Sequence, residues 1–167
     1  ALDANLFSLA GYRSDQMDRG VTLHSTLGYT RMNFDTKRLD GSQTLTGKRL
    51  GDQLFAEVTL NPVEKSDEAL KITPFGKSSI VYSSLRPYSE QGGSYALFYA
   101  KQEQSMATVS VGIDASYETY YAGGRVLPSL GLEYGSSKKF GKGGSVRYLS
   151  ETTVYLLTPD QAKTESI

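Results

Sequence analysis

The chain has 167 residues, enough for one domain with a sizeable core, and its 18 basic and 18 acidic residues balance, so no net field attracts nucleic acid or an anionic membrane surface. It contains no cysteine and one histidine, which excludes disulfides and thiolate chemistry and leaves few options for a transition-metal site; no cofactor is expected.

The strongest pattern in the chain is the alternation of apolar and polar residues with a period of two, which predicts β-strands. In residues 109–118, VSVGIDASYE, apolar side chains alternate with Ser, Gly, Asp and Glu. No apolar run approaches the ~20 residues of a transmembrane helix. About eight alternating segments follow one another, at residues 5–13, 20–34, 54–61, 70–82, 94–101, 109–118, 125–134 and 145–157.

Stretches rich in glycine, serine, aspartate or asparagine separate these segments and predict hairpin turns. They lie at residues 14–20, 39–47, 86–93, 122–124 and 135–144. Strands joined by successive hairpins form an antiparallel up-and-down meander, and closure of such a sheet removes its unpaired edges. We therefore predict an all-β fold of about eight strands, an outer-membrane-type β-barrel or most of one, over residues 1–158, followed by a polar tail at 159–167.

The composition of the polar rows indicates which face of the sheet is inside. An outer-membrane barrel turns its apolar rows to lipid and its polar rows to the lumen, the reverse of a soluble barrel. The polar rows hold small residues and charges of both signs, which suits a crowded lumen, and tyrosines stand near the ends of apolar rows, as in an aromatic girdle. The charges predicted to line the lumen, in a structural and electrostatic role, are Lys71, Lys77, Asp114, Glu118, Arg125 and Glu133.

The alternative from the same pattern is a soluble or small outer-membrane β-barrel that binds an apolar ligand without catalysis, with the apolar rows lining its cavity. Dependence on detergent separates these two classes of protein.

No catalytic or metal-binding residue is expected. His24 could serve as a general base, but the adjacent Ser25 points to the opposite face of a strand, and no G-x-S-x-G motif is present. Asp114 and Glu118 are about 13 Å apart on one strand, too far for a glycosidase pair. An enzyme would require another serine within hydrogen-bond reach of His24.

Four segments resemble the translocator domain of autotransporters, one of them being residues 109–119, VSVGIDASYET. Residues 70–92, LKITPFGKSSIVYSSLRPYSEQG, contain an apolar-Thr-Pro-aromatic step and a loop ending in Tyr-x-Glu-x-Gly. Residues 20–38 contain a Gly-Tyr pair and an Asp-x-x-Arg step, and residues 123–135 contain a glycine-rich turn before a Leu-x-Pro-like strand. The residues that carry the resemblance are Gly28, Tyr29, Asp35, Arg38, Thr73, Pro74, Phe75, Tyr88, Glu90, Gly92 and Pro128.

The resemblance implies an outer-membrane protein of a Gram-negative bacterium that anchors an N-terminal passenger and helps translocate it to the cell surface. Its implied partners are outer-membrane lipid, the passenger polypeptide and the barrel-assembly machinery. The family pattern also implies about twelve strands, a helix in the pore and a final strand ending in an aromatic residue. With about eight predicted strands and Ile167 at its end, the chain is expected to be either a domain that is incomplete at both ends or a divergent member of the family.

Overall fold

The computed structural model describes residues 1–17, 20–62, 69–157 and 164–166. Within these ranges the regular secondary structure is entirely β-strand. No helix in this part of the chain is long and apolar enough to cross a membrane. In chain order the strands are β1 (Leu2–Met17), β2 (Val21–Asp40), β3 (Gln43–Pro62), β4 (Leu70–Leu85), β5 (Tyr88–Ser89), β6 (Leu97–Tyr99), β7 (Gln102–Tyr117), β8 (Thr119–Tyr121), β9 (Gly124–Val126), β10 (Ser129–Lys142), β11 (Gly144–Tyr148), β12 (Tyr155–Leu157) and β13 (Thr164–Ser166).

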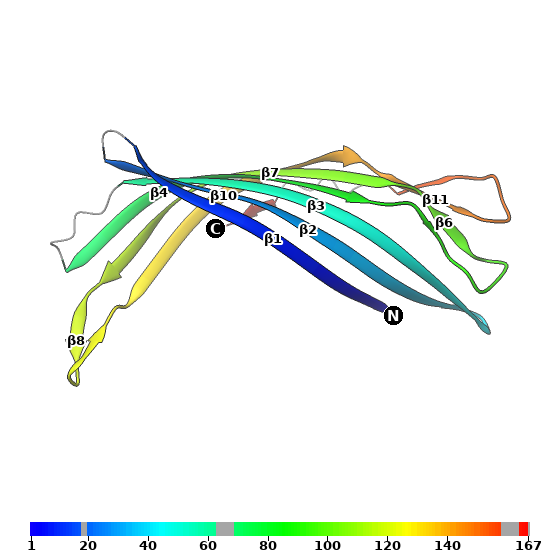
Figure 1. The fold of residues 1–167 in the computed structure, drawn as a ribbon, viewed down its shortest axis with the longest axis horizontal. Helices are drawn as coiled ribbons and strands as arrows, with labels where there is room; N and C mark the ends of the chain where they lie inside the picture. The colour runs from blue at the N-terminus through cyan, green and yellow to red at the C-terminus, as the bar shows by residue number, and fades with distance from the viewer. Residues whose placement is uncertain (18–19, 63–68, 158–163, 167) are drawn as a thin grey trace.

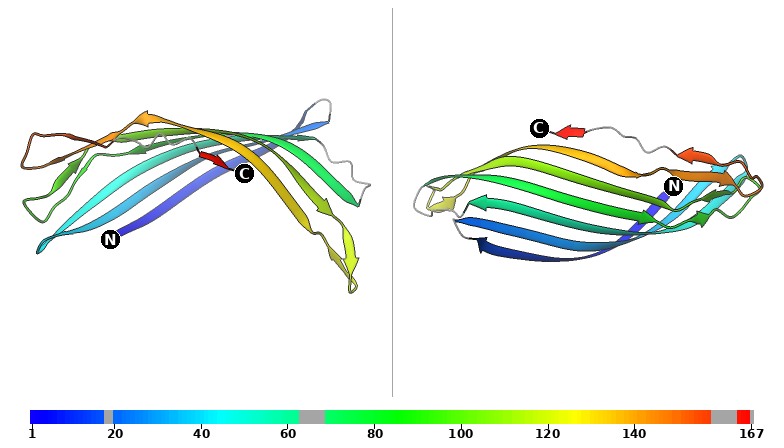
Figure 2. Two further views of the ribbon diagram at one scale, coloured as in Figure 1. Left: turned by 180° about the vertical axis from the view of Figure 1, so that it is seen from behind. Right: turned by 90° about the horizontal axis from the view of Figure 1, so that it is seen from above.

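The long strands form one antiparallel sheet in the order β1-β2-β3-β4-β7-β10-β13. A four-stranded sheet of β12-β11-β6-β5 continues it at one end, and the β8–β9 hairpin lies at the other end. Figures 1 and 2 show an arched, open sheet with β1 at one edge. The predicted antiparallel meander is confirmed, and the arch corresponds to part of a barrel wall. We call the two ends of the arch the β2–β3 end, which holds the turn at residues 41 and 42, and the β8–β9 end.

The structure corrects the predicted turn at residues 135–144. Most of this stretch lies in β10, which pairs with β7 without interruption from Gly135, opposite Ser110, to Lys142, opposite Glu103. Glycine, serine and lysine are typical of turns, but pairing with an available neighbouring strand overrides that preference. The chain therefore reverses later, in residues 149–154 between β11 and β12.

Other predicted boundaries also move. The predicted turn at 39–47 shrinks to residues 41 and 42, where Gly41 has a φ of 59°, the positive value that a two-residue hairpin turn requires. The predicted strand 145–157 is a pair of strands, β11 and β12. In the predicted tail, Thr164–Ser166 pairs with β10, and the other tail residues lie outside the described ranges.

The two faces of the sheet differ in chemistry and in exposure. On β4, the side chains of Ile72 and Ile80 are 61 and 54% exposed, whereas that of Lys77, on the other face, is 28% exposed. Side chains on the concave side of an arch converge and shield one another, whereas those on the convex side spread apart. The polar rows therefore lie on the concave side, which we call the inner face, and the apolar rows lie on the convex outer face, as in an outer-membrane barrel.

Exposed apolar side chains form a continuous band on the outer face, which we call the outer belt. It comprises Leu27, Leu54, Val58, Leu60, Leu70, Ile72, Ile80, Val109, Val111, Ile113, Leu130 and Leu132. On β4 the outer belt extends from Leu70 to Tyr82, which is about 40 Å along the strand. Tyrosines stand at its edge toward the β2–β3 end, namely Tyr29 on β2, Tyr82 on β4 and Tyr134 on β10.

The outer belt crosses the strands diagonally. On β1 the outer apolar residues nearest the β2–β3 end are Phe7 and Leu9, and the row of Leu9 runs through Tyr29 and ends at Phe140 on β10. On β10, however, the belt is centred at Leu132, about eight residues from Phe140. With strands ~4.8 Å apart and residues ~3.3 Å apart, this drift gives a strand tilt of about 45°, close to that of membrane barrels. At that tilt the belt on β4 is about 28 Å high, near the ~25 Å of a membrane barrel.

Two aromatic rings lie over glycines on the inner face. The register pairs Gly28 on β2 with Phe55 on β3, and Phe75 on β4 with Gly112 on β7. A Cβ atom at either glycine would collide with the facing ring. At Gly112 it would also lie 2.5 Å from the backbone oxygen of Leu132. The missing side chains thus let two rings lie flat across the strands, which fixes the register of each pair.

We expect Gly28→Ala to destabilise the sheet by about 1 to 3 kcal/mol, because the added methyl group displaces the Phe55 ring. The matched control is Gly76→Ala on β4, where an added Cβ meets no described atom within 4 Å. The free energy of unfolding in detergent, measured by denaturant titration, checks the difference. Phe55→Leu should restore part of the loss in Gly28→Ala; equal losses at Gly28 and Gly76 would contradict the explanation.

Candidate functional site

Of the charges predicted to line the lumen, Lys77 and Glu133 form an ion pair across the inner face. The Lys77 Nζ atom lies 2.8 Å from Glu133 Oε1 and links β4 to β10 across β7. Ser110 of β7, opposite Lys77 in register and 3% exposed, lies between them. Cross-strand hydroxyl pairs, Ser8–Thr30 and Thr108–Ser137, each 2.9 Å apart, add to this polar face.

The other predicted lumen charges are distributed over two places. Lys71 and Asp114 lie on the inner face by register, since Lys71 pairs with Ser116 and Thr73 with Asp114. Glu118 and Arg125 pair with each other, 2.7 Å apart, at the base of the β8–β9 hairpin and beyond the end of β7. The structure therefore separates this second ion pair from the inner-face pair.

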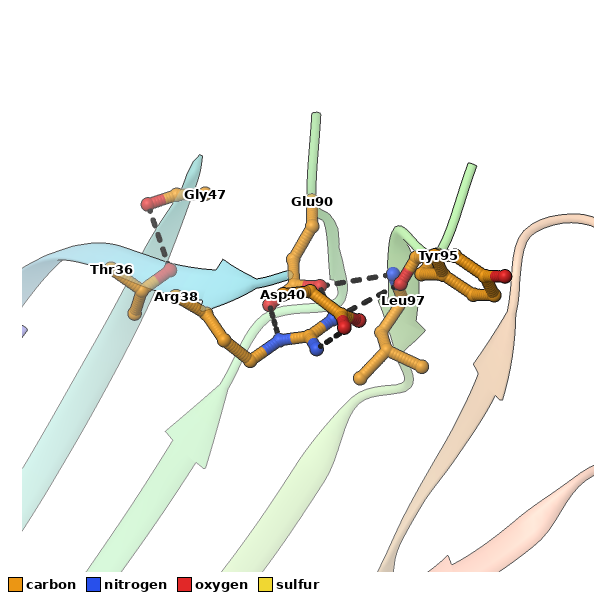
Figure 3. A network of polar contacts seen from close by, with 7 residues as sticks. All are labelled: Thr36, Arg38, Asp40, Gly47, Glu90, Tyr95 and Leu97. Atoms are coloured by element: carbon orange, nitrogen blue, oxygen red, sulfur yellow. Dashed lines mark hydrogen bonds and ion pairs between the residues drawn. The ribbon is translucent and has the colours of Figure 1, made fainter. Parts of the chain in front are cut away.

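A second polar cluster lies on the inner face at the β2–β3 end, and residues far apart in the sequence meet there (Figure 3). The Arg38 guanidinium on β2 donates to both oxygens of Glu90, through Nη2 at 2.7 Å and Nε at 3.2 Å. Nη2 also donates to the carbonyl oxygen of Tyr95 at 3.0 Å, and Nη1 to Asp40 at 3.2 Å. Glu90 Oε2 accepts a further hydrogen bond from the backbone N–H of Leu97 at 3.1 Å.

Burial makes the Arg38–Glu90 pair stronger than a surface ion pair. The Glu90 side chain is 4% exposed and that of Arg38 36% exposed. The hydrogen-bonded Glu90 carboxylate holds the pKa of Arg38 above its ordinary value. Leu45 on β3, opposite Arg38 in register, is fully buried beside them. Together these contacts hold the segment between β5 and β6 over the inner face at this end of the sheet.

Glycine is required where that segment crosses β3. Gly92 has a φ of 111°, a conformation that L side chains rarely adopt, and a Cβ there would collide with the backbone oxygen of Thr44. The loop backbone also pairs with the strand through hydrogen bonds between Thr46 and Gln91. The Tyr-x-Glu-x-Gly motif thus acts as one unit in which Glu90 supplies the ion pair and Gly92 permits the close approach.

Arg49 on β3 is a structural residue that the sequence did not reveal. Regular pairing between β4 and β7 stops at Leu85, and Pro87 has no N–H group with which to continue it. Arg49 Nε donates to the Arg86 oxygen at 3.0 Å and Nη2 to the Ala100 oxygen at 3.1 Å, which bridges the interruption. Burial lowers the pKa of Arg49, whose guanidinium also lies 5.5 Å from the Tyr88 ring centroid.

We expect Arg49→Met to cost about 1.5 to 3 kcal/mol, because two carbonyl oxygens lose a charged donor while the apolar stem is kept. The control is Lys48→Met on the same strand, which removes an 88% exposed lysine paired with Asp35 and should cost less than about 1 kcal/mol. Denaturant titration in detergent compares the two. Equal costs would show that the bridge contributes nothing specific.

The residues that carry the family resemblance fall into distinct places. Arg38, Tyr88, Glu90 and Gly92 meet in the β2–β3 end cluster, where the Tyr88 ring stacks on Tyr99 with centroids 4.8 Å apart. Gly28 and Phe75 belong to the two aromatic-glycine pairs on the inner face.

Of the remaining resemblance residues, Thr73 lies on the inner face opposite Asp114, and the others lie on the outer face or at a turn. On the outer face, Tyr29 donates to Asp52 at 2.5 Å, and Asp35 pairs with Lys48 at 3.3 Å. Pro74 lies in an outer row of β4, and the Pro128 oxygen accepts from the N–H of Tyr117 where β10 begins.

His24 lies on the inner face, where Ser14 of β1 and Thr59 of β3 flank it in register. The register places Ser25 on the opposite face, as predicted. It also places Ser14 directly opposite His24 on the neighbouring strand, which the sequence alone could not show. Among the described residues there is no group of three or more His, Cys, Asp or Glu side chains that could hold a metal ion.

Comparison with known proteins agrees with this geometry. No curated protein matches the chain significantly. The family model of the autotransporter β-domain, however, matches residues 1–161, nearly the whole chain. The chain therefore belongs to the autotransporter β-domain family, the outer-membrane translocator barrels of type V secretion.

Proposed function

We propose that this chain forms part of the membrane-embedded barrel that anchors an N-terminal passenger and helps carry it to the cell surface. The observation that carries the proposal is the inverted sheet, with an apolar outer belt of membrane height and a polar inner face. A closed wall of this kind encloses a hydrated passage while its outer surface contacts lipid. The passenger and the barrel-assembly machinery are the proposed partners, in the outer membrane of a Gram-negative bacterium.

In this proposal the inner-face charges have a structural role. The Lys77–Glu133 pair and the hydroxyl rows keep the passage wet and hold neighbouring strands in register. Lys71 and Asp114 extend the same face, and Glu118 and Arg125 fix the hairpin at the β8–β9 end. No step of the function requires catalysis. His24→Ala is accordingly expected to leave folding and passenger display unchanged, as measured by surface labelling.

The first test is whether the chain needs detergent or lipid. Expressed alone and refolded, it should reach a β-rich, heat-stable state only in micelles or vesicles, because the outer belt is then covered. A monomeric, folded chain in plain buffer would overturn the proposal in favour of the apolar-ligand barrel. A reporter fused at the N-terminus of the intact protein then tests translocation, through cleavage of the reporter by protease added outside whole cells.

A further inference from the structure

The outer face carries a repeated arrangement directly beyond the tyrosine edge of the outer belt. Tyr29 on β2 donates to Asp52 on β3 at 2.5 Å, and Arg86 lies 3.2 Å from the same carboxylate. One strand pair further on, the Tyr82 hydroxyl donates to Glu103 at 2.5 Å, and Lys101 lies 2.7 Å from that carboxylate. In each case a tyrosine at the belt edge orients an acid, which in turn orients a cation.

These cations stand at the depth of lipid headgroups. The register places Arg31 and Asp52 one row beyond Tyr29. Arg86 and Lys101 adjoin the last residue pair of β4 and β7, Leu85 with Gln102, which puts them about one row further. Two rows are about 13 Å along a strand, or about 9 Å above the belt at a tilt of 45°. Arg86 and Lys101 are 52 and 56% exposed, so their charged groups remain accessible from the membrane side.

Positive charge exceeds negative charge on this rim. Within two rows beyond the tyrosine edge the described outward cations are Arg31, Arg86, Lys101 and Lys138, and the described outward carboxylates are Asp52 and Glu103. At the β8–β9 end the described outward arginine, Arg13, is matched by Asp15 at 2.7 Å. The two membrane edges therefore differ in charge.

We propose that this rim, formed by Arg31, Arg86, Lys101 and Lys138 above the tyrosine edge, docks the phosphate groups of membrane lipids. The inference rests on the proposed membrane function. The rim continues the lipid-facing belt, and its excess positive charge matches a phosphate at that depth. The connection between β4 and β7, residues 86–101, lies at the β2–β3 end and is longer than the connection between β7 and β10, residues 118–128, at the other end. Because outer-membrane barrels carry their longer loops outside, this rim faces the outer leaflet.

The test uses the full chain folded in neutral detergent, with its fold verified by heat-dependent gel mobility. Native mass spectrometry counts bound phosphatidic acid, compared with diacylglycerol of the same acyl chains. We expect retention of the phosphate-bearing lipid, and about tenfold weaker binding by the double variant Arg86→Gln/Lys101→Gln. The controls are Lys48→Gln, at an outward lysine further from the belt, and Arg125→Gln, at the opposite end; both should bind as the parent does.

Equal retention of both lipids, or equal losses in the control variants, would overturn the rim proposal. Displacement of the lipid by millimolar inorganic phosphate would do so as well, because it would indicate a site for the free anion. A chain that folds in buffer without detergent would instead overturn the proposed membrane function itself. The two failures are therefore distinguishable.

Discussion

Val111→Arg is expected to destabilise the folded chain in lipid bilayers by about 2 to 4 kcal/mol, because it places a charge in the middle of the outer belt. Val111 lies on the interior strand β7, between β4 and β10, is 60% exposed and points away from the inner face. In water, an arginine at such an exposed position changes stability by less than about 0.5 kcal/mol. Folding into vesicles of defined lipid, followed by denaturant titration, gives the free energy of unfolding that decides between these values.

The control variants test whether the cost of an added arginine falls with its distance from the middle of the belt, as it does only in a membrane. Leu54→Arg lies at the edge of the belt, next to Asp52, and should cost about 0 to 1 kcal/mol. Leu39→Arg, 73% exposed on β2 near the turn and far from the belt, should have almost no effect. Equal large losses at Val111 and Leu54 would indicate a uniformly dry interior, as in the apolar-ligand barrel, and would contradict the lipid-facing assignment.

The sequence was sufficient to predict the strands and their two faces, because a period of two is a local property. Val111 and Ser110 were separated correctly onto outer and inner faces from the alternation alone. Residues 135–144 were not predicted correctly, because glycine, serine and lysine serve equally in turns and in barrel walls. Only the availability of a pairing partner, here the first half of β7, decides between the two outcomes.

Contacts between distant residues were beyond the reach of one sequence. Lys77 and Glu133 were predicted to share the lumen, and the structure does place them on one face and within one ion pair. Arg38 and Glu90 were recognised separately through family resemblance, but nothing in their spacing of 52 residues predicted that they meet. Nothing in the sequence indicated the role of Arg49, because that role depends on an interruption in the pairing of two other strands, β4 and β7.

Glu90→Ala is expected to cost about 3 kcal/mol, because it removes the buried carboxylate that accepts twice from the Arg38 guanidinium and leaves the Leu97 N–H without its acceptor. The value is at the low end for a broken buried ion pair because Arg38 is partly exposed. Asp40→Ala is the matched control, since it removes the other carboxylate from the same guanidinium, 3.2 Å away and 39% exposed, and should cost less than about 1 kcal/mol.

A double-mutant cycle of Glu90→Ala with Arg38→Met isolates the contact itself, and we expect a coupling energy of about 1 to 3 kcal/mol. The effect should be local, so hydrogen exchange at the amides of Glu90, Gln91 and Leu97 should quicken while β4 and β7 stay protected. A coupling near zero would mean that the backbone pairing of Thr46 with Gln91 holds the segment by itself. Because Glu90 is deeply buried against the inner face, a coupling energy in the expected range would identify the ion pair as a main contact that holds the segment between β5 and β6 on that face.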